Sequence, residues 1–184
     1  GRGAEGIYHA TFNPDNGKFS PAKLAAKIGS PGFLAHHPNG KILYSLSRWD
    51  GKAGTVGYQR SAGGELKEFT RMVCPDGGGA HIAVHPSGKF LLTAQYGGGS
   101  TALFPLDAKG NLGEPTIHEH KGGSKVVQRR QDSPHPHWCG FSPDGKFALV
   151  PDLGLDQIVI YKVNADKTAI TPHAFGQSVP GGGP

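Results

Sequence analysis

A pair of histidines in the second half of the chain has the residue types and the spacing for acid–base chemistry. His135 and His137 flank a proline at the start of residues 134–154, PHPHWCGFSPDGKFALVPDLG. An unperturbed imidazole titrates near pH 6.5, so it can take up or release a proton at neutral pH. Because His137 directly precedes an apolar run, we expect it to begin a strand and to act in catalysis by activating water. A hydrogen bond from its ring to a loop carbonyl is the alternative.

A basic segment precedes these histidines and offers positive charge to an anion. Residues 121–130 read KGGSKVVQRR and belong to a long insertion, 121–134. The guanidinium of Arg130 can hold a carboxylate or phosphate through two parallel hydrogen bonds, or stabilise the oxyanion that forms when a carbonyl is attacked. We therefore expect Arg130 to act with His137 in catalysis, and Gln131 to contact the substrate.

Other polar side chains are expected to bind substrate at the same place: His81, Tyr96, His135 and Asp152. His81 stands in its sequence repeat where Phe33 stands in the preceding one. We therefore expect two histidines from neighbouring repeats, His81 and His137, to face one cavity. Asp152 has two alternatives, since its carboxylate can orient a histidine or cap the end of a strand.

Two His-x-His pairs, His118 with His120 and His135 with His137, raise the question of a metal. On a strand this spacing places both rings on the same side, as zinc sites require. No cysteine or carboxylate completes a recognisable ligand set nearby. We therefore expect no metal and no other cofactor.

A hairpin pattern recurs along the chain and must position these residues. Its copies are FLAHHPNGKILYSL at 33–46, HIAVHPSGKFLLTA at 81–94, and the segment 134–154, with turn glycines at 40, 88 and 145. The spacings of 48 and 57 residues, with paired strands in each copy, are typical of propeller blades. The prediction is an all-β fold, a partial β-propeller domain over 1–184 with blade repeats near 33–74, 81–120 and 137–175.

Several predicted strands are apolar on both faces, for example 42–44, 90–92 and 158–161. Such strands lie in sheets that are covered on both sides, as stacked blades are. The ending GGGP has the composition of the turns that lead into each repeat, so we expect a further blade just beyond Pro184. About three to three and a half blades cannot close a ring, and we expect the isolated chain to associate through its two open faces.

Composition narrows the class of protein. The net charge of +5 is spread along 184 residues, and no nucleic-acid recognition motif accompanies it. No run is long enough to cross a membrane, and two cysteines do not make a disulfide framework. We expect neither nucleic-acid nor membrane partners. A cytoplasmic location is expected, with a secreted or periplasmic one open if a leader was removed.

Three segments together resemble one known family. They are AHIAVHPSGKFLLTAQYGGGS at 80–100, the pair Arg130-Gln131, and the segment 134–154. They are similar to the bacterial lactonase family of seven-bladed β-propellers, which includes 6-phosphogluconolactonases and has carboxymuconate lactonizing enzymes as relatives. The resemblance implies about the N-terminal half of such a propeller, with the remaining blades supplied by the rest of the chain. Gln95 departs from it, since the family usually has asparagine there.

The resemblance also implies a function. It implies hydrolysis of a sugar lactone, with 6-phosphogluconolactone as the leading substrate, and places His137 at the histidine implicated in proton transfer in the lactonizing relatives. A small anionic lactone or sugar phosphate is the expected partner. The alternatives are a cycloisomerase acting on a muconate-like diacid and a non-enzymatic binding scaffold.

Overall fold

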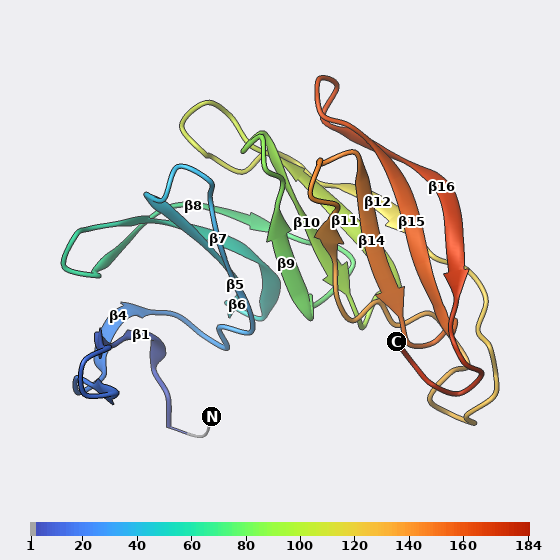
Figure 1. Ribbon diagram of the computed structural model, residues 1–184, viewed down its shortest axis with the longest axis horizontal. Helices are drawn as coiled ribbons and strands as arrows, with labels where there is room; N and C mark the ends of the chain where they lie inside the picture. The colour runs from blue at the N-terminus through green and yellow to red at the C-terminus, as the bar shows by residue number, and fades with distance from the viewer. Residues whose placement is uncertain (1–2) are drawn as a thin grey trace.

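The computed structural model describes residues 3–184, so the first two residues of the predicted domain lie outside the described residues. The strands form three four-stranded antiparallel sheets and two shorter strand pairs (Figure 1). The first sheet contains β5 (Leu34–His36), β6 (Ile42–Trp49), β7 (Lys52–Arg60) and β8 (Leu66–Val73). The second contains β9 (His81–Val84), β10 (Phe90–Gln95), β11 (Ser100–Pro105) and β12 (Thr116–Glu119). The third contains β13 (Gly140–Phe141), β14 (Phe147–Asp152), β15 (Gln157–Asn164) and β16 (Ala169–Gln177).

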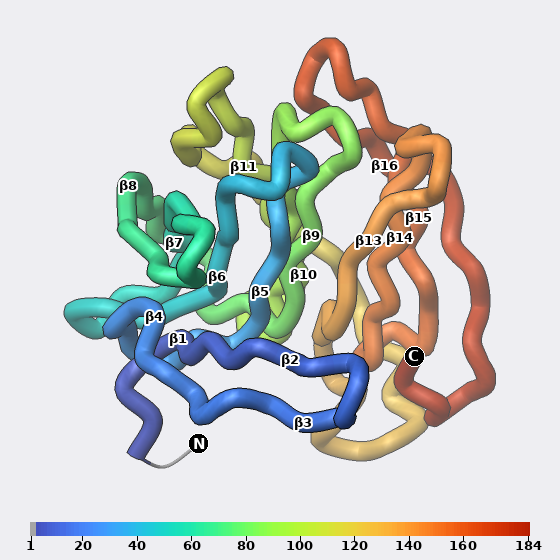
Figure 2. Tube along the Cα trace, turned by 60° about the vertical axis from the view of Figure 1, so that its left-hand side comes forward, coloured from blue at the N-terminus to red at the C-terminus, as the bar shows by residue number. Residues whose placement is uncertain are grey.

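The three sheets stand side by side with their first strands innermost. Each sheet is a simple meander in which consecutive strands pair. β9 contacts both β5 and β13, and the three inner strands run next to one another in Figure 2. The later strands of each sheet then fan outward, with β16 at one open face (Figure 1). This is the arrangement of successive propeller blades, and it confirms the predicted fold class.

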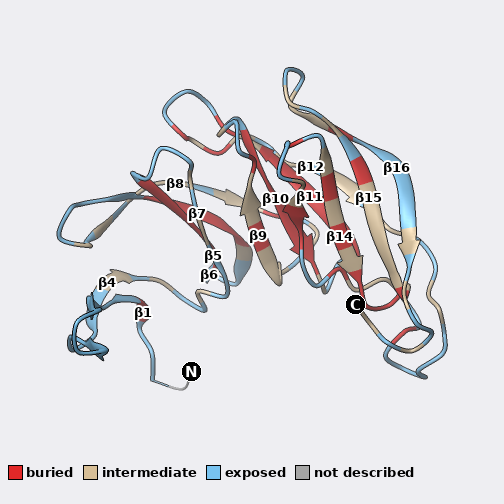
Figure 3. Cartoon of the chain, viewed as in Figure 1, coloured by how far each residue is buried: buried red, intermediate tan, exposed pale blue. Residues whose placement is uncertain are grey.

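The blades are joined by apolar side chains that alternate along each strand. In β10, Leu91 packs toward the first blade, in a cluster with Tyr44 and Phe104. Its neighbours Phe90 and Leu92 point the other way, into the cluster of the third blade. Successive side chains of a strand face opposite sides of the sheet, so a strand buried on both faces must be apolar throughout. Figure 3 shows β10 and β11 as the most completely buried strands.

A histidine at the hairpin turn fastens each of the first two blades to the next one. Nε2 of His37 donates to the carbonyl of Gly88 at 3.1 Å, and Nε2 of His85 donates to the carbonyl of Gly145 at 3.0 Å. The backbone N–H of Ser87 donates to Nδ1 of His85 at 3.1 Å, which fixes the proton on Nε2. Gly145 has φ +69°, and a Cβ there would lie 2.9 Å from that same Nε2. The turn therefore requires glycine both for its conformation and for the approach of the ring.

Replacing His85 with phenylalanine tests how much this hydrogen bond between neighbouring blades contributes to stability. The ring would still stack on Phe90 and meet the edge of Phe141, but the carbonyl of buried Gly145 would lose its donor. An unpaired buried carbonyl costs about 1–3 kcal/mol, so we expect the free energy of unfolding in urea to fall by that amount. His37→Phe, at a half-buried boundary, should cost less. A His85→Phe variant as stable as the parent would show that the hydrogen bond from His85 to the next hairpin contributes nothing to the free energy of unfolding.

The N-terminal strands form a partial unit against the first blade. β1 (Gly6–His9) pairs with β4 (Lys23–Lys27), and β2 (Phe12–Asn13) pairs with β3 (Lys18–Phe19). Ile7 on β1 packs against Val56 and Tyr58 on β7. Residues 10 and 11 separate β1 from β2, and the β1–β4 register shifts between Ile7 and Tyr8, inside β1.

His137, which we expected to begin a strand, lies before β13, because β13 begins at Gly140. Two prolines, at 134 and 136, lack the N–H that a ladder needs, and only an isolated bridge joins Pro136 to Asp152. Both cysteines, Cys74 and Cys139, are free and buried. No helix within residues 3–184 is long and apolar enough to span a membrane.

Candidate active site

One edge of the blades collects most of the residues expected to do chemistry. The inner strands β5, β9 and β13 begin at this edge, and the second strands β6, β10 and β14 end there. The loops that lead into the inner strands therefore lie beside the ends of the second strands. Antiparallel pairing thus brings His81, Tyr96 and the segment 134–138 to one place, although they are far apart in the sequence.

Three aromatic rings form a row across the starts of the inner strands. The ring of His81 lies 4.1 Å from that of Phe33 and 5.3 Å from that of Trp138, between centroids. Phe33 and Trp138 remain 43% and 42% exposed. The row occupies the same repeat position in all three blades, seven residues before each turn glycine. Exposed aromatic rings beside polar groups suit the binding of a small organic ligand.

His81 is held in one neutral form. Burial lowers the pKa of His81, the backbone hydrogen bond with Cys139 partly opposes this, and the nearby His137 lowers the pKa further. The backbone N–H of Cys139 donates to Nδ1 at 3.4 Å, so the proton of the neutral ring resides on Nε2. That Nε2–H has no hydrogen-bond acceptor within residues 3–184. His81 therefore offers a donor at neutral pH.

His137 is exposed and its backbone is fixed. Its N–H donates to the carbonyl of Pro151 at 3.1 Å, and its ring meets the edge of the Tyr96 ring at 5.7 Å. Tyr96 also stacks on His135 at 4.6 Å, whose Nδ1–H donates to the Tyr96 carbonyl at 2.9 Å. The structure thus brings together four of the expected residues, His81, Tyr96, His135 and His137.

A buried network lies directly behind this group and centres on Asp152. Oδ1 of Asp152 accepts from the backbone N–H of His135 at 2.8 Å and of Gly154 at 2.9 Å. Oδ2 accepts from Nδ1–H of His120 at 2.7 Å, with the two side chains 0% and 1% exposed. Asp152 therefore caps the strand end and also orients a histidine. Because it is fully buried, it cannot touch a ligand, contrary to our expectation that it binds substrate.

His120 is the residue that sequence reasoning missed. Its Nε2 accepts from the hydroxyl of Tyr161 at 2.9 Å, and burial raises the pKa of Tyr161 to about 12, so the phenol stays protonated. The histidine thus links the end of β12 to β15 and to the segment that carries His137. In the sequence it appeared only as half of a His-x-His pair. Its position just after β12, across the blade boundary from Asp152, was the available signal.

Gln131 is also a supporting residue rather than a substrate contact. It is 1% exposed, and its Nε2 donates to the carbonyl of Leu153 at 2.9 Å and to Oδ1 of Asp156 at 2.6 Å. Its Oε1 accepts from the N–H of Val127 at 2.8 Å. Gln131 therefore ties the insertion to the turn after β14. Arg130 is exposed on the same insertion, and no contact within residues 3–184 joins its guanidinium to His137.

The His-x-His pairs do not converge. His120 is hydrogen-bonded to Asp152 and Tyr161, and His135 is hydrogen-bonded to the carbonyl of Tyr96. His118 packs edge-on against Tyr161. Within the part of the chain that the structure describes, no three histidine, cysteine or carboxylate side chains are placed to hold a metal.

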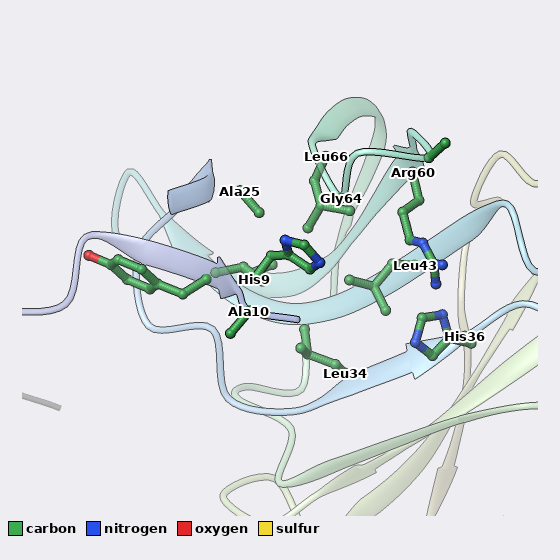
Figure 4. Close-up of a pocket in the computed structure, with 12 residues that line it drawn as sticks. His9, Ala10, Ala25, Leu34, His36, Leu43, Arg60, Gly64 and Leu66 are labelled. Carbon is green, nitrogen blue, oxygen red and sulfur yellow. The ribbon is translucent and has the colours of Figure 1, made fainter. Parts of the chain in front are cut away.

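A separate cavity of about 320 Å³ lies away from this site, between β1 and the first blade (Figure 4). His9, His36, Arg60 and Leu34 are among its lining residues. None of the residues that we expected to act in catalysis lines it. It borders the edge of β1 that pairs with no strand in residues 3–184, so it is a groove beside an open sheet edge.

Acid is expected to destabilise the protein through two half-buried histidines. Burial lowers the pKa of both His81 and His118. In the unfolded chain these groups bind protons from about pH 6.5 downward, whereas in the folded chain they do so only at lower pH. Their contribution to stability is therefore present above about pH 6.5 and is lost as the pH falls below it. Urea unfolding between about pH 7 and pH 5 measures this, and His118→Phe should flatten the pH dependence, whereas exposed His173→Phe should not.

Successive four-stranded blades, with a histidine and aromatic cluster at the inner-strand starts, make this chain part of a β-propeller. Residues 1–184 match the family described as lactonase, 7-bladed β-propeller. The chain belongs to this lactonase family, which confirms the resemblance seen in the sequence.

Two relatives and one solved structure illustrate the match. The 6-phosphogluconolactonase of Bacillus subtilis is 34% identical over 184 residues, 99% of this chain and 52% of that protein. The 6-phosphogluconolactonase of Formosa agariphila is 32% identical over 165 residues, 88% of this chain and 46% of that protein. The structure of the periplasmic gluconolactonase of Pseudomonas aeruginosa superposes with a TM-score of 0.89 at 27% identity, covering 99% of this chain and 54% of that one. The chain thus spans about half the length of these relatives.

Proposed function

We propose that the intact protein hydrolyses a sugar lactone, with 6-phosphogluconolactone as its substrate. The observation that carries the proposal is the grouping of exposed His137 with His81 and Tyr96 at the inner edge of the blades. The relatives named 6-phosphogluconolactonase, at 34% and 32% identity, support the choice of substrate.

In the proposed mechanism His137 is the general base. Its imidazole takes a proton from a water molecule whose oxygen attacks the carbonyl carbon of the lactone. Negative charge then develops on the carbonyl oxygen, where Nε2–H of neutral His81 and the charge of Arg130 would stabilise it. When the bond to the ring oxygen breaks, the protonated His137 returns its proton to that oxygen. The products are a hydroxyl group and a carboxylic acid, which then releases its proton to solvent and becomes a carboxylate.

The supporting residues explain how such a base would be held in place. Asp152 and His120 fix the backbone of His135 from behind, and the N–H of His137 is bonded to Pro151. A base whose backbone is fixed on both sides loses little entropy when substrate binds. The exposed rings of Phe33 and Trp138 offer an apolar surface to the carbon face of the sugar.

The rest of the propeller belongs to the same proposal. We propose that further blades of the intact protein cover β16, where Phe175 is 64% exposed, and Val179 just after it, which is 75% exposed. Those blades would also contribute residues to the site. Two free cysteines agree with a reducing compartment, which supports a cytoplasmic location.

The direct test is turnover by the intact protein. We expect it to open 6-phosphogluconolactone faster than the spontaneous reaction, which is measured in parallel and subtracted. A muconate-type diacid serves as the competing substrate. Turnover of the diacid alone would replace hydrolysis with cycloisomerisation, and no turnover of either substrate would leave a binding scaffold.

A further inference from the structure

A second, smaller cavity opens at the same edge of the blades, between the first blade and the loop that leads into the second. Its volume is about 130 Å³, and its lining includes Ser30, Ser47, Arg48, Gly78 and Gly79. Sites that enclose a whole small molecule are usually about 300–1,000 Å³. This cavity therefore suits one functional group of a ligand rather than an entire ligand.

Arg48 supplies a fixed positive charge to this cavity. Its backbone is anchored, since its N–H donates to the carbonyl of Gly29 at 2.8 Å. Its guanidinium forms no ion pair with a carboxylate of residues 3–184. Asp50 and Asp76 are the acidic residues nearest to the cavity in sequence, and the Asp76 carboxylate is engaged by the hydroxyl of Ser100. The arginine is thus free to bind an external anion.

The glycine loop opposite Arg48 is shaped for close approach. A Cβ on Gly78 would lie 2.9 Å from Nη2 of Arg48, so the guanidinium lies directly against this loop. The backbone N–H groups of Gly78 and Gly79 donate no hydrogen bond to any residue from 3 to 184. Unpaired N–H groups in a glycine loop, together with an arginine, are the elements of an anion-binding concavity.

We propose that this cavity binds a phosphate monoester through Arg48 and the amides of Gly78 and Gly79. Gly79 lies two residues before His81. A phosphate bound in this cavity would therefore lie close enough for the carbon chain of a single sugar to reach the cluster around His81. In this reading, which rests on the proposed lactonase function, Arg48 selects the phosphorylated lactone over the unphosphorylated one.

Binding of inorganic phosphate to the intact protein, measured by titration calorimetry, tests the site without reference to turnover. Arg48→Gln should weaken phosphate binding about 10- to 100-fold, because charge-assisted hydrogen bonds are lost. Gly78→Ala keeps the charge but pushes the guanidinium aside, and should also weaken it. Arg60→Gln makes the same change of charge away from the cavity and should leave binding unchanged. Equal phosphate affinity in Arg48→Gln and the parent, or no binding by the parent, would overturn the site.

Kinetics separate this site from the proposed function. Arg48→Gln should raise KM for 6-phosphogluconolactone at least tenfold while leaving KM for the unphosphorylated lactone unchanged. Arg48-dependent phosphate binding without any lactone turnover would sink the lactonase proposal and keep the site. Lactone turnover with the same KM in Arg48→Gln and the parent would overturn the phosphate site and keep the lactonase proposal.

Discussion

Replacing Asp152 with alanine is expected to lower the free energy of unfolding by about 3–5 kcal/mol, because several buried hydrogen-bond donors lose their acceptor at once, each at a cost of about 1–3 kcal/mol. Three backbone N–H groups, of His135, Gly154 and Leu155, would lose their acceptor. His120 would lose the partner of its Nδ1–H, 2.7 Å away. Urea unfolding of the intact protein measures the loss. Asp152→Asn keeps one acceptor oxygen and should cost about 1–3 kcal/mol.

Asp144 provides a matched control for this substitution. It is also a turn aspartate that accepts hydrogen bonds from its own hairpin, but it is exposed. Asp144→Ala should therefore cost no more than about 1 kcal/mol. If alanine is tolerated equally well at both positions, the Asp152 network does not hold the segment around His135 in place.

The second large effect concerns chemistry rather than stability. His137→Ala in the intact protein should reduce kcat/KM for 6-phosphogluconolactone by about 10²- to 10⁴-fold, the usual contribution of a positioned general base. The imidazole is exposed, so the melting temperature should change little. Initial rates of lactone opening, corrected for the spontaneous reaction, measure the loss.

His173 is the matched control, because it is an exposed histidine on the outermost strand β16. His173→Ala should keep the parent rate. Equal rates for His137→Ala and His173→Ala would remove His137 from the mechanism.

Local chemistry and repetition made most of the fold predictable. The turn glycines Gly40, Gly88 and Gly145 all have positive φ, and the apolar strands beside them read directly as blade hairpins. The start of the third inner strand was less accurate, because the prolines before β13 lack ladder N–H groups and only an isolated bridge forms there. These effects depend on which partner each N–H meets, and a single strand's sequence does not contain that information.

The position of the candidate site could be predicted from the sequence. The sequence did not show which of its residues face a ligand and which form hydrogen bonds inside the protein. Residue type marked His81, Tyr96 and His137 as ligand-facing groups, and the structure leaves polar atoms of these residues accessible. It also marked Gln131 and Asp152, whose polar atoms are fully used inside the protein. An amide or a carboxylate has the same appearance in the sequence whether it binds a ligand or a backbone. Only the packing of β12, β14 and the insertion decides between them.

The turn histidines have a consequence for how the protein opens. His37 and His85 each reach the following hairpin, whereas the third hairpin has Ser142 at that position, and its hydroxyl bonds within its own turn, to Asp144. The first two hairpins are therefore linked to the following blade, and the third hairpin is bonded within itself. Amide hydrogen exchange should accordingly be slower in β10, which lies between the two linked boundaries, than in β16.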